Sequence, residues 1–177
     1  MNSLPANPLP ANLQPDCAKC CGLCCIVPPF DADQGFGHDK PAHEPCRHLQ
    51  ADFRCSIHGQ LAQSGYPGCA GFDCFGAGQR VTQELFGGSS WSAAPGIARE
   101  MFECYERLRP LHELMAMATF AIDRTADVTY REALREAVSR IDALCTREGR
   151  PDIVQIRHET IDLLRRALSD QEGSLSS

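Results

Sequence analysis

Nine of the eleven cysteines in this chain of 177 residues lie between residues 17 and 74, and five of them fall within the stretch CAKCCGLCC. Thiolates are favoured ligands of zinc and of iron–sulfur clusters, and a C-x2-C spacing brings two thiolates to one ion. Two such pairs are consecutive in the stretch, and a C-x8-C pair and a C-x4-C pair follow it. The sequence therefore predicts a metal centre whose candidate ligands are Cys17, Cys20, Cys21, Cys24, Cys25, Cys46, Cys55, Cys69 and Cys74.

The number of thiols bears on the kind of centre. Neighbouring side chains tend to point apart, so one member of each doublet, 20–21 and 24–25, is expected to face a second site or a shared polynuclear cluster. Two four-thiolate zinc sites with one thiol left over fit the count, and so do iron–sulfur clusters each held by four cysteines. Cysteines buried as inert core residues would recur with the periodicity of a helix or a strand, and the nine clustered cysteines do not. Metal binding is thus favoured, with zinc and iron–sulfur both open.

Six histidines offer nitrogen ligands. His48 and His58 each follow a cysteine closely, so each is expected either to ligate or to hydrogen-bond a ligating sulfur, and the second role is favoured because thiols already exceed the need. The others have no companion spacing and are expected at the surface; they are His38, His43, His112 and His158.

The elements that must position these thiols divide the chain into two halves. Residues 17–80 are punctuated by Gly and Pro, carry no sustained apolar period, and contain too few apolar side chains to offset their ordering entropy. Bonds from thiolate to metal are expected to hold this half together. The fold class predicted is α, with an irregular cysteine-rich module stapled by metal and a small helical hairpin or three-helix array after it.

The second half shows helical periodicity. A stripe with spacing 4-3-4-3-4-3-4 runs from Ile97 to Ile122, and Pro110 is expected to kink or break it. A second helix is predicted over 129–147, stopped by Gly149, and a third over 151–168. Cys104 and Cys145 lie on the apolar stripes and are expected to be core residues.

Five segments follow from these patterns. Residues 1–16 and 171–177 are expected to be flexible tails, residues 17–80 the cysteine-rich metal-binding module, and residues 97–170 the helical region. A linker over 81–96 is predicted to carry a short helix at 81–86. Trp91 in this linker is expected to dock the two halves together.

Three blocks of residues 17–75 resemble the YkgJ-like cysteine-cluster family, to which zinc or iron chelation is ascribed. The blocks are CGLCC (21–25), PCRHLQADFRCSIH (45–58) and GYPGCAGFDC (65–74). The resemblance implies that Cys21, Cys24, Cys25, Cys46, Cys55, Cys69 and Cys74 are ligands, with Cys17 or Cys20 as the eighth. The chain departs from the family pattern in the spacing upstream of Cys21 and in Tyr66, which stands where the family has arginine. The family also resembles the cysteine-rich part of flagellin lysine N-methylases, but a glycine-rich turn for S-adenosylmethionine is missing here.

Composition limits the remaining classes. A formal net charge of -6 disfavours nucleic acid and anionic membranes as partners. The N-terminus lacks the charge and apolar run of a secretory signal, and the longest apolar run is too short to span a bilayer, so a cytoplasmic location is expected. The leading hypothesis is a cytoplasmic metal-binding protein with a structural, sensory or electron-carrying centre, with or without a protein partner. The alternative is a thiol redox enzyme or part of a protein-modifying system, although no catalytic motif is present.

Overall fold

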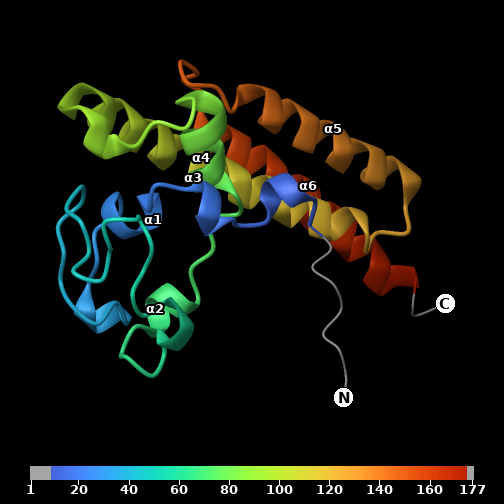
Figure 1. Ribbon diagram of the computed structural model, residues 1–177. Coiled ribbons are helices and arrows are strands. Elements are labelled where there is room, and N and C mark those ends of the chain that lie inside the picture. Colours follow the sequence, from blue (N-terminus) through green and yellow to red (C-terminus); the bar gives the residue numbers. More distant parts are fainter. Residues whose placement is uncertain (1–8, 175–177) are drawn as a thin grey trace. The chain divides into compact units, whose positions relative to one another are not determined.

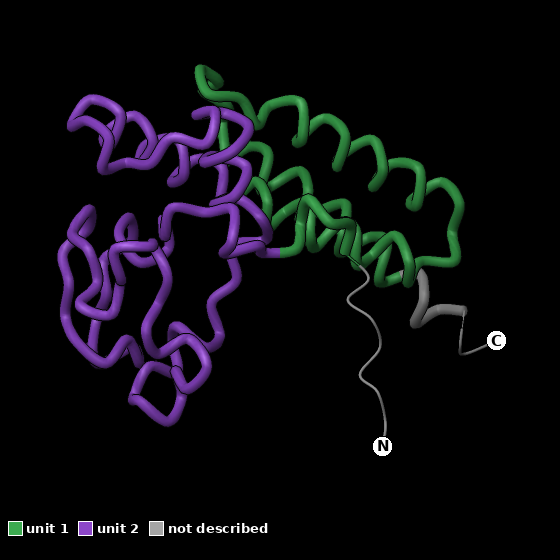
Figure 2. The backbone as a smooth tube through the Cα atoms, in the orientation of Figure 1, with its two compact units in different colours: residues 1–14, 110–177 green, residues 15–109 purple. Residues whose placement is uncertain are grey.

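The computed structural model describes residues 9–174, with side-chain surroundings up to residue 169. This part of the chain is mostly helical and contains no strand, in agreement with the predicted α class (Figure 1). It divides into two compact units: one contains residues 15–109 and the other residues 110–177 together with the N-terminal residues up to 14 (Figure 2). No helix in the described part is long and apolar enough to cross a bilayer.

The unit of residues 15–109 holds the nine clustered cysteines on short elements joined by turns. The helices are α1 (Leu23–Ile26), α2 (Pro67–Ala70), α3 (Ala77–Gln79), which continues into a π-helix (Arg80–Leu85), and the first half of α4 (Pro95–Ile122). Two isolated antiparallel bridges, Phe30 with Lys40 and Leu49 with Cys55, close the loops between α1 and α2.

This unit has an apolar core, contrary to the expectation that metal bonds alone must hold it. Leu23, Ile26 and Val81 are fully buried, as are Met101 and Leu108 on α4. The buried apolar side chains of this unit come in about equal numbers from residues 17–80 and from the segment beyond residue 80, so the two segments share one core. The unit boundary accordingly falls inside α4, after residue 109, rather than at residue 80 or 96.

The segment predicted as a linker is part of this core. Its helical run begins at Ala77, earlier than the expected 81–86, and Val81 and Thr82 are buried. Trp91 packs against Phe53 and Phe102 with ring centroids 5.8 and 6.2 Å apart. Trp91 therefore joins a cysteine-rich loop to α4, as expected for its docking role.

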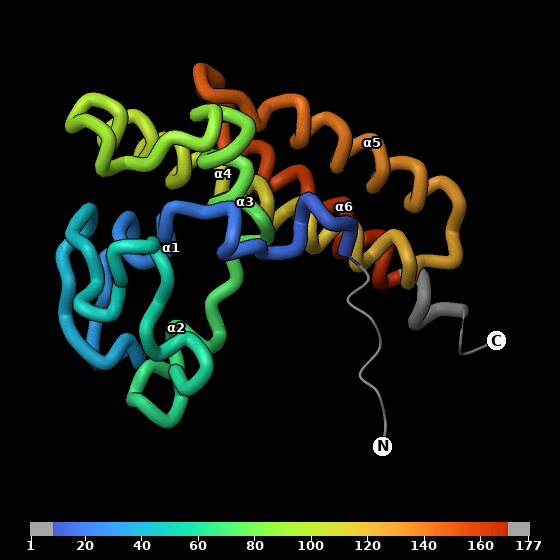
Figure 3. The backbone as a smooth tube through the Cα atoms, in the orientation of Figure 1, coloured from blue at the N-terminus to red at the C-terminus, as the bar shows by residue number. Residues whose placement is uncertain are grey.

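The second unit contains the end of α4, α5 (Val128–Leu144) and α6 (Ile153–Ser174). These three helices lie side by side (Figure 3) and bury one cluster between them, formed by Ala118, Ala121, Leu134, Leu164 and Ala167. Cys145 in this unit is buried, as is Cys104 in the unit of residues 15–109, which confirms both as core positions.

The helix boundaries differ in part from those expected. α4 continues through Pro110 without a break, because the helix on both sides of it is held by buried residues such as Leu108 and Leu111. α5 starts one residue earlier, where the Asp127 carboxylate accepts hydrogen bonds from the first turn, and ends at Leu144. Gly149 therefore does not end α5, and α6 extends six residues past its expected end.

The predicted tails lie partly outside the described residues, which exclude 1–8 and 175–177. Within the described part, Leu9 and Leu13 are buried, and residues 171–174 belong to α6. Both tails are therefore shorter than expected.

Candidate metal centre

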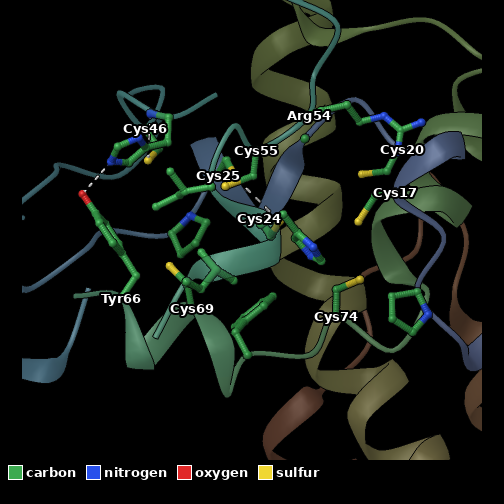
Figure 4. A pocket seen from close by; sticks show the side chains of 18 of the residues that line it. Cys17, Cys20, Cys24, Cys25, Cys46, Arg54, Cys55, Tyr66, Cys69 and Cys74 are labelled. Carbon is green, nitrogen blue, oxygen red and sulfur yellow. Dashed lines mark hydrogen bonds between the residues drawn. The ribbon is translucent and has the colours of Figure 1, made fainter. Parts of the chain in front are cut away.

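Eight of the nine clustered cysteines line one cavity of about 500 Å³ in the first unit (Figure 4). They come from three separate parts of the chain: the turn and helix of residues 17–25, the loop of residues 46–55, and α2 with the turn after it. The eight are Cys17, Cys20, Cys24, Cys25, Cys46, Cys55, Cys69 and Cys74. The structure thus brings Cys17 and Cys20 to the cavity together, where the sequence left a choice between them.

Cys21 is the exception, because its side chain does not line the cavity. Its side chain is buried, with Sγ 3.4 Å from the Thr82 hydroxyl and 3.4 Å from Met101 Sδ. Its carbonyl accepts a hydrogen bond from Trp91 Nε1 at 2.8 Å. Cys21 therefore ties the cysteine-rich loop to the core, and the ligand role that the resemblance implies for it stays a prediction.

Gly22 explains why Cys21 and Cys24 face different surroundings. Its φ of 75° is left-handed, and a Cβ there would lie 2.8 Å from Leu49 Cδ1. The reversal at this glycine separates a residue that enters the core from the helix α1, which carries Cys24 and Cys25 to the cavity. A pattern of CxxC pairs does not contain this information, because it counts thiols without fixing their direction.

Four of the thiols also surround a second, smaller hollow of about 20 Å³, which we call the first thiol group: Cys17, Cys20, Cys24 and Cys74. Burial is the main reason that the pKa of Cys20 rises to about 12, and the nearby thiol of Cys74 adds to the rise. Burial also raises the pKa of Cys17, again with a contribution from Cys74. These sulfurs are close enough to oppose one another's ionisation.

Tyr105 of α4 lies against the first thiol group and is 3% exposed. Its hydroxyl has no hydrogen-bond partner within the described part of the chain. Burial raises the pKa of Tyr105 well above its ordinary value, followed by the effect of Cys24 and Cys74. A buried O–H without an acceptor is costly, and a thiolate sulfur beside it would be a suitable acceptor.

The other four cavity cysteines form the second thiol group: Cys25, Cys46, Cys55 and Cys69. In Figure 4, Cys25, Cys46 and Cys69 lie on the side of Tyr66, whereas Cys17, Cys20 and Cys74 lie together on the opposite side. Burial, followed by the thiols of Cys25, Cys46 and Cys55, raises the pKa of Cys69 to about 11. Burial likewise raises the pKa values of Cys46 and Cys55, with Cys25 as a neighbour of each.

The doublet Cys24–Cys25 joins the two groups, with its sulfurs 4.0 Å apart. The hydrogen bond from the Cys24 thiol lowers the pKa of Cys25, burial opposes this, and Lys40 assists it. The same hydrogen bond, together with burial, raises the pKa of Cys24 well above its ordinary value. Cys25 is therefore the first of the two to ionise.

Lys40 is a buried cation beside the second thiol group. Its ammonium group donates to the carbonyls of Ile26, Pro28 and Pro41 at 3.1, 2.7 and 2.9 Å. These bonds fasten the loop of residues 26–41 and fix one positive charge near Cys25 and Cys46, whose thiolates it favours.

Backbone amides favour the thiolate form at three of the cavity cysteines. The amide of His48 lies 3.4 Å from Cys46 Sγ and donates to it. Burial raises the pKa values of Cys20 and Cys55, and backbone amides oppose this effect: those of Leu23 and Gly22 at Cys20, and that of Ile57 at Cys55. Fixed N–H donors of this kind stabilise a sulfur that carries negative charge, as a metal-bound thiolate does.

A chain of hydrogen bonds at the cavity wall was not predicted from the sequence. His48 Nε2 lies 2.9 Å from the Tyr66 hydroxyl, which lies 3.0 Å from His38 Nδ1. Gly37 makes room for it, since a Cβ there would lie 2.6 Å from the Tyr66 ring. Residues 38, 48 and 66 are far apart in the sequence and form no motif, so the sequence alone does not indicate that they meet. The chain gives His48 a defined orientation beside Cys46.

The remaining histidines fall into three situations. His58 lines the cavity and is exposed. His43 and His158 are exposed as expected, and pair with Glu106 and Asp162. His112 is wholly buried in α4, so its predicted surface position is wrong; its place on the helix falls within the apolar stripe, next to Leu111.

No group of three or more Cys, His, Asp or Glu side chains within the described residues is already close enough to hold a metal ion. The eight sulfurs line a shared space instead, so ligation requires them to draw together. The donor set consists of soft thiolates with nitrogen donors at the edge, which suits zinc, iron–sulfur clusters and similar centres rather than magnesium or calcium.

Comparison with known proteins identifies a relative of uncharacterized function. The chain is 35% identical over 133 residues to the uncharacterized protein YybG of Bacillus subtilis (strain 168), an alignment that covers 75% of this chain and 48% of that protein. The chain thus spans about half the length of this curated relative. No family model matches the chain, and no solved structure matches it. The resemblance to the YkgJ-like family stays a prediction.

Proposed function

We propose that this protein binds metal through the eight cavity thiols, as zinc ions or as an iron–sulfur centre, and that this metal holds the cysteine-rich loops in place. The observation that carries the proposal is the convergence of eight cysteines, from three separate segments, on one cavity. Residues that serve merely as small apolar side chains have no reason to meet in this way, as Cys104 and Cys145 illustrate by lying within helical stripes.

Two further features support the proposal. Amide donors aimed at Cys20, Cys46 and Cys55 stabilise thiolates, which are the metal-binding form. Tyr105 lines the same hollow as four thiols, and its hydroxyl has no hydrogen-bond partner in the described part of the chain. This hydroxyl would gain an acceptor if one of the four were a metal-bound thiolate within its reach.

The role that fits these features best is structural. The loops between α1 and α3 contain short turns and two isolated bridges, and their sulfurs surround a cavity rather than packed side chains. Metal in this cavity would link the loops of residues 17–25, 46–55 and 69–74.

Elemental analysis and a visible spectrum of protein purified without oxygen test the proposal. We expect stoichiometric zinc with no colour, or iron with the absorption of an iron–sulfur cluster. A Cys104→Ala variant, which removes a core thiol away from the cavity, serves as the matched control and is expected to keep its metal. Wild-type protein that carries no metal, and takes up none on anaerobic incubation with zinc or with iron and sulfide, would contradict the proposal.

A further inference from the structure

The cavity thiols fall into two sets of four that differ in their surroundings. The first thiol group borders the hollow of about 20 Å³ against α3 and α4. Such a hollow is the size of a single water molecule or ion, since about 10–15 Å³ of this kind of volume is needed to hold one water. The second thiol group does not border this hollow; its members line the larger cavity alone.

An independent observation points to a ligand in the first hollow. Tyr105 lines it and is buried, and its hydroxyl has no hydrogen-bond partner in the described part of the chain. Buried hydroxyls are rarely left without an acceptor. A thiolate that has lost its proton to a metal ion becomes that acceptor, whereas a neutral thiol accepts weakly.

The wall of the hollow also fits closely around one sulfur. A Cβ at Gly78 would lie 2.7 Å from Cys20 Sγ, so the glycine leaves space for that sulfur. A substituted side chain at this position of α3 would push the sulfur out of its place.

Building on the proposed function, we infer that the cavity holds two separate four-thiolate metal sites: one formed by Cys17, Cys20, Cys24 and Cys74, and one formed by Cys25, Cys46, Cys55 and Cys69. The first site takes a single thiophilic divalent ion such as Zn²⁺, and Tyr105 donates a hydrogen bond to one of its sulfurs. Each ion displaces protons from its four thiols, and no oxidant or reductant is required. The doublet 24–25 is divided between the sites, and Cys21 belongs to neither.

The test uses Co²⁺ as a probe, added without oxygen to the metal-free full chain, with the ions counted by native mass spectrometry. We expect two ions in the wild type, one in Cys74→Ser and one in Cys69→Ser, none in the double variant, and two in the control Cys21→Ala. Tetrahedral Co²⁺–thiolate absorption should halve in each single variant. A Cys74→Ser protein that loses both ions would show one coupled cluster and overturn the division.

Tyr105→Phe keeps all the thiols and so tests the division even where a serine variant folds poorly. We expect it to bind two ions and to shift the sulfur-to-cobalt absorption of one of them. An unchanged spectrum would overturn the place of Tyr105 in the first site. Failure of the wild type to bind any Co²⁺ would overturn metal binding itself, whereas binding without this division would overturn the two-site arrangement alone.

Discussion

Gly78→Ala offers a way to disturb one cavity thiol without removing any cysteine. The new Cβ would lie 2.7 Å from Cys20 Sγ, and ordinary contact begins near 3.4 Å, so the sulfur must move by about 0.7 Å or more. Metal–thiolate bonds of about 2.3 Å tolerate deviations of about 0.2 Å. The displacement is roughly three times that tolerance.

The backbone itself should accept this substitution. Gly78 lies in α3 with a helical conformation, where alanine favours the helix by about 1 kcal/mol. The other atoms near the new Cβ are Cβ of Cys20 at 3.7 Å and Cε2 of Tyr105 at 3.9 Å, both ordinary contacts. We therefore expect a folded protein whose first thiol group loses affinity for metal by more than about tenfold.

Metal content by elemental analysis, together with competition against a graded series of chelators, measures this effect. Gly59→Ala is the matched control, because a Cβ at Gly59 meets nothing within 4 Å in the same unit. If Gly78→Ala binds as much metal, and as tightly, as Gly59→Ala, then the Cys20 sulfur is not a ligand held against α3, and the reasoning about the first thiol group is wrong.

Three further perturbations follow from the structure. Cys21→Ala should keep its full metal content but lower the free energy of unfolding by about 1–2 kcal/mol in urea, because it leaves a small void in the core; a lost ion would make Cys21 a ligand. Tyr66→Phe should lower the free energy of unfolding by about 1–3 kcal/mol, because it removes two hydrogen bonds, and should leave the number of bound metal ions unchanged. The loss of an ion would instead indicate that His48 is a ligand. Burial raises the pKa of Cys20 from its ordinary value of 9.0 to about 12. The free energy of unfolding of the metal-free protein should therefore be highest below pH 9 and fall by up to about 4 kcal/mol as the pH rises towards 12. A free energy of unfolding, measured with denaturant, that is the same or higher at pH 11 than at pH 8 would contradict this.

The long helices could be predicted because their apolar stripes are local patterns. Met101, Leu108 and Leu111 repeat at helical spacing, and all three are buried in α4. Pro110 does not break the helix, since tertiary burial on both sides outweighs the local cost of proline. The tendency of proline to interrupt a helix is a local property, whereas α4 is also held by tertiary contacts.

The cysteine-rich half was predicted less well, because what organises it is not local. Its core depends on Met101 and Tyr105, which lie far along the chain from Cys21 and Cys24. The nine thiols were recognisable by number and spacing, but the direction of Cys21 depends on the left-handed φ of Gly22. The partners of Tyr66 likewise meet through folding alone.

X-ray absorption at the K edge of the bound metal tests the central claim most directly, because it reports the atoms around the metal in the full-length protein. For zinc we expect a shell of about four sulfur atoms near 2.3 Å, averaged over the sites, and for an iron–sulfur centre a sulfur shell with an additional metal–metal distance. The Cys21→Ala protein should give the same spectrum. A shell of oxygen and nitrogen near 2.0–2.1 Å with no sulfur would show that the cavity thiols do not hold the metal, and would contradict the account.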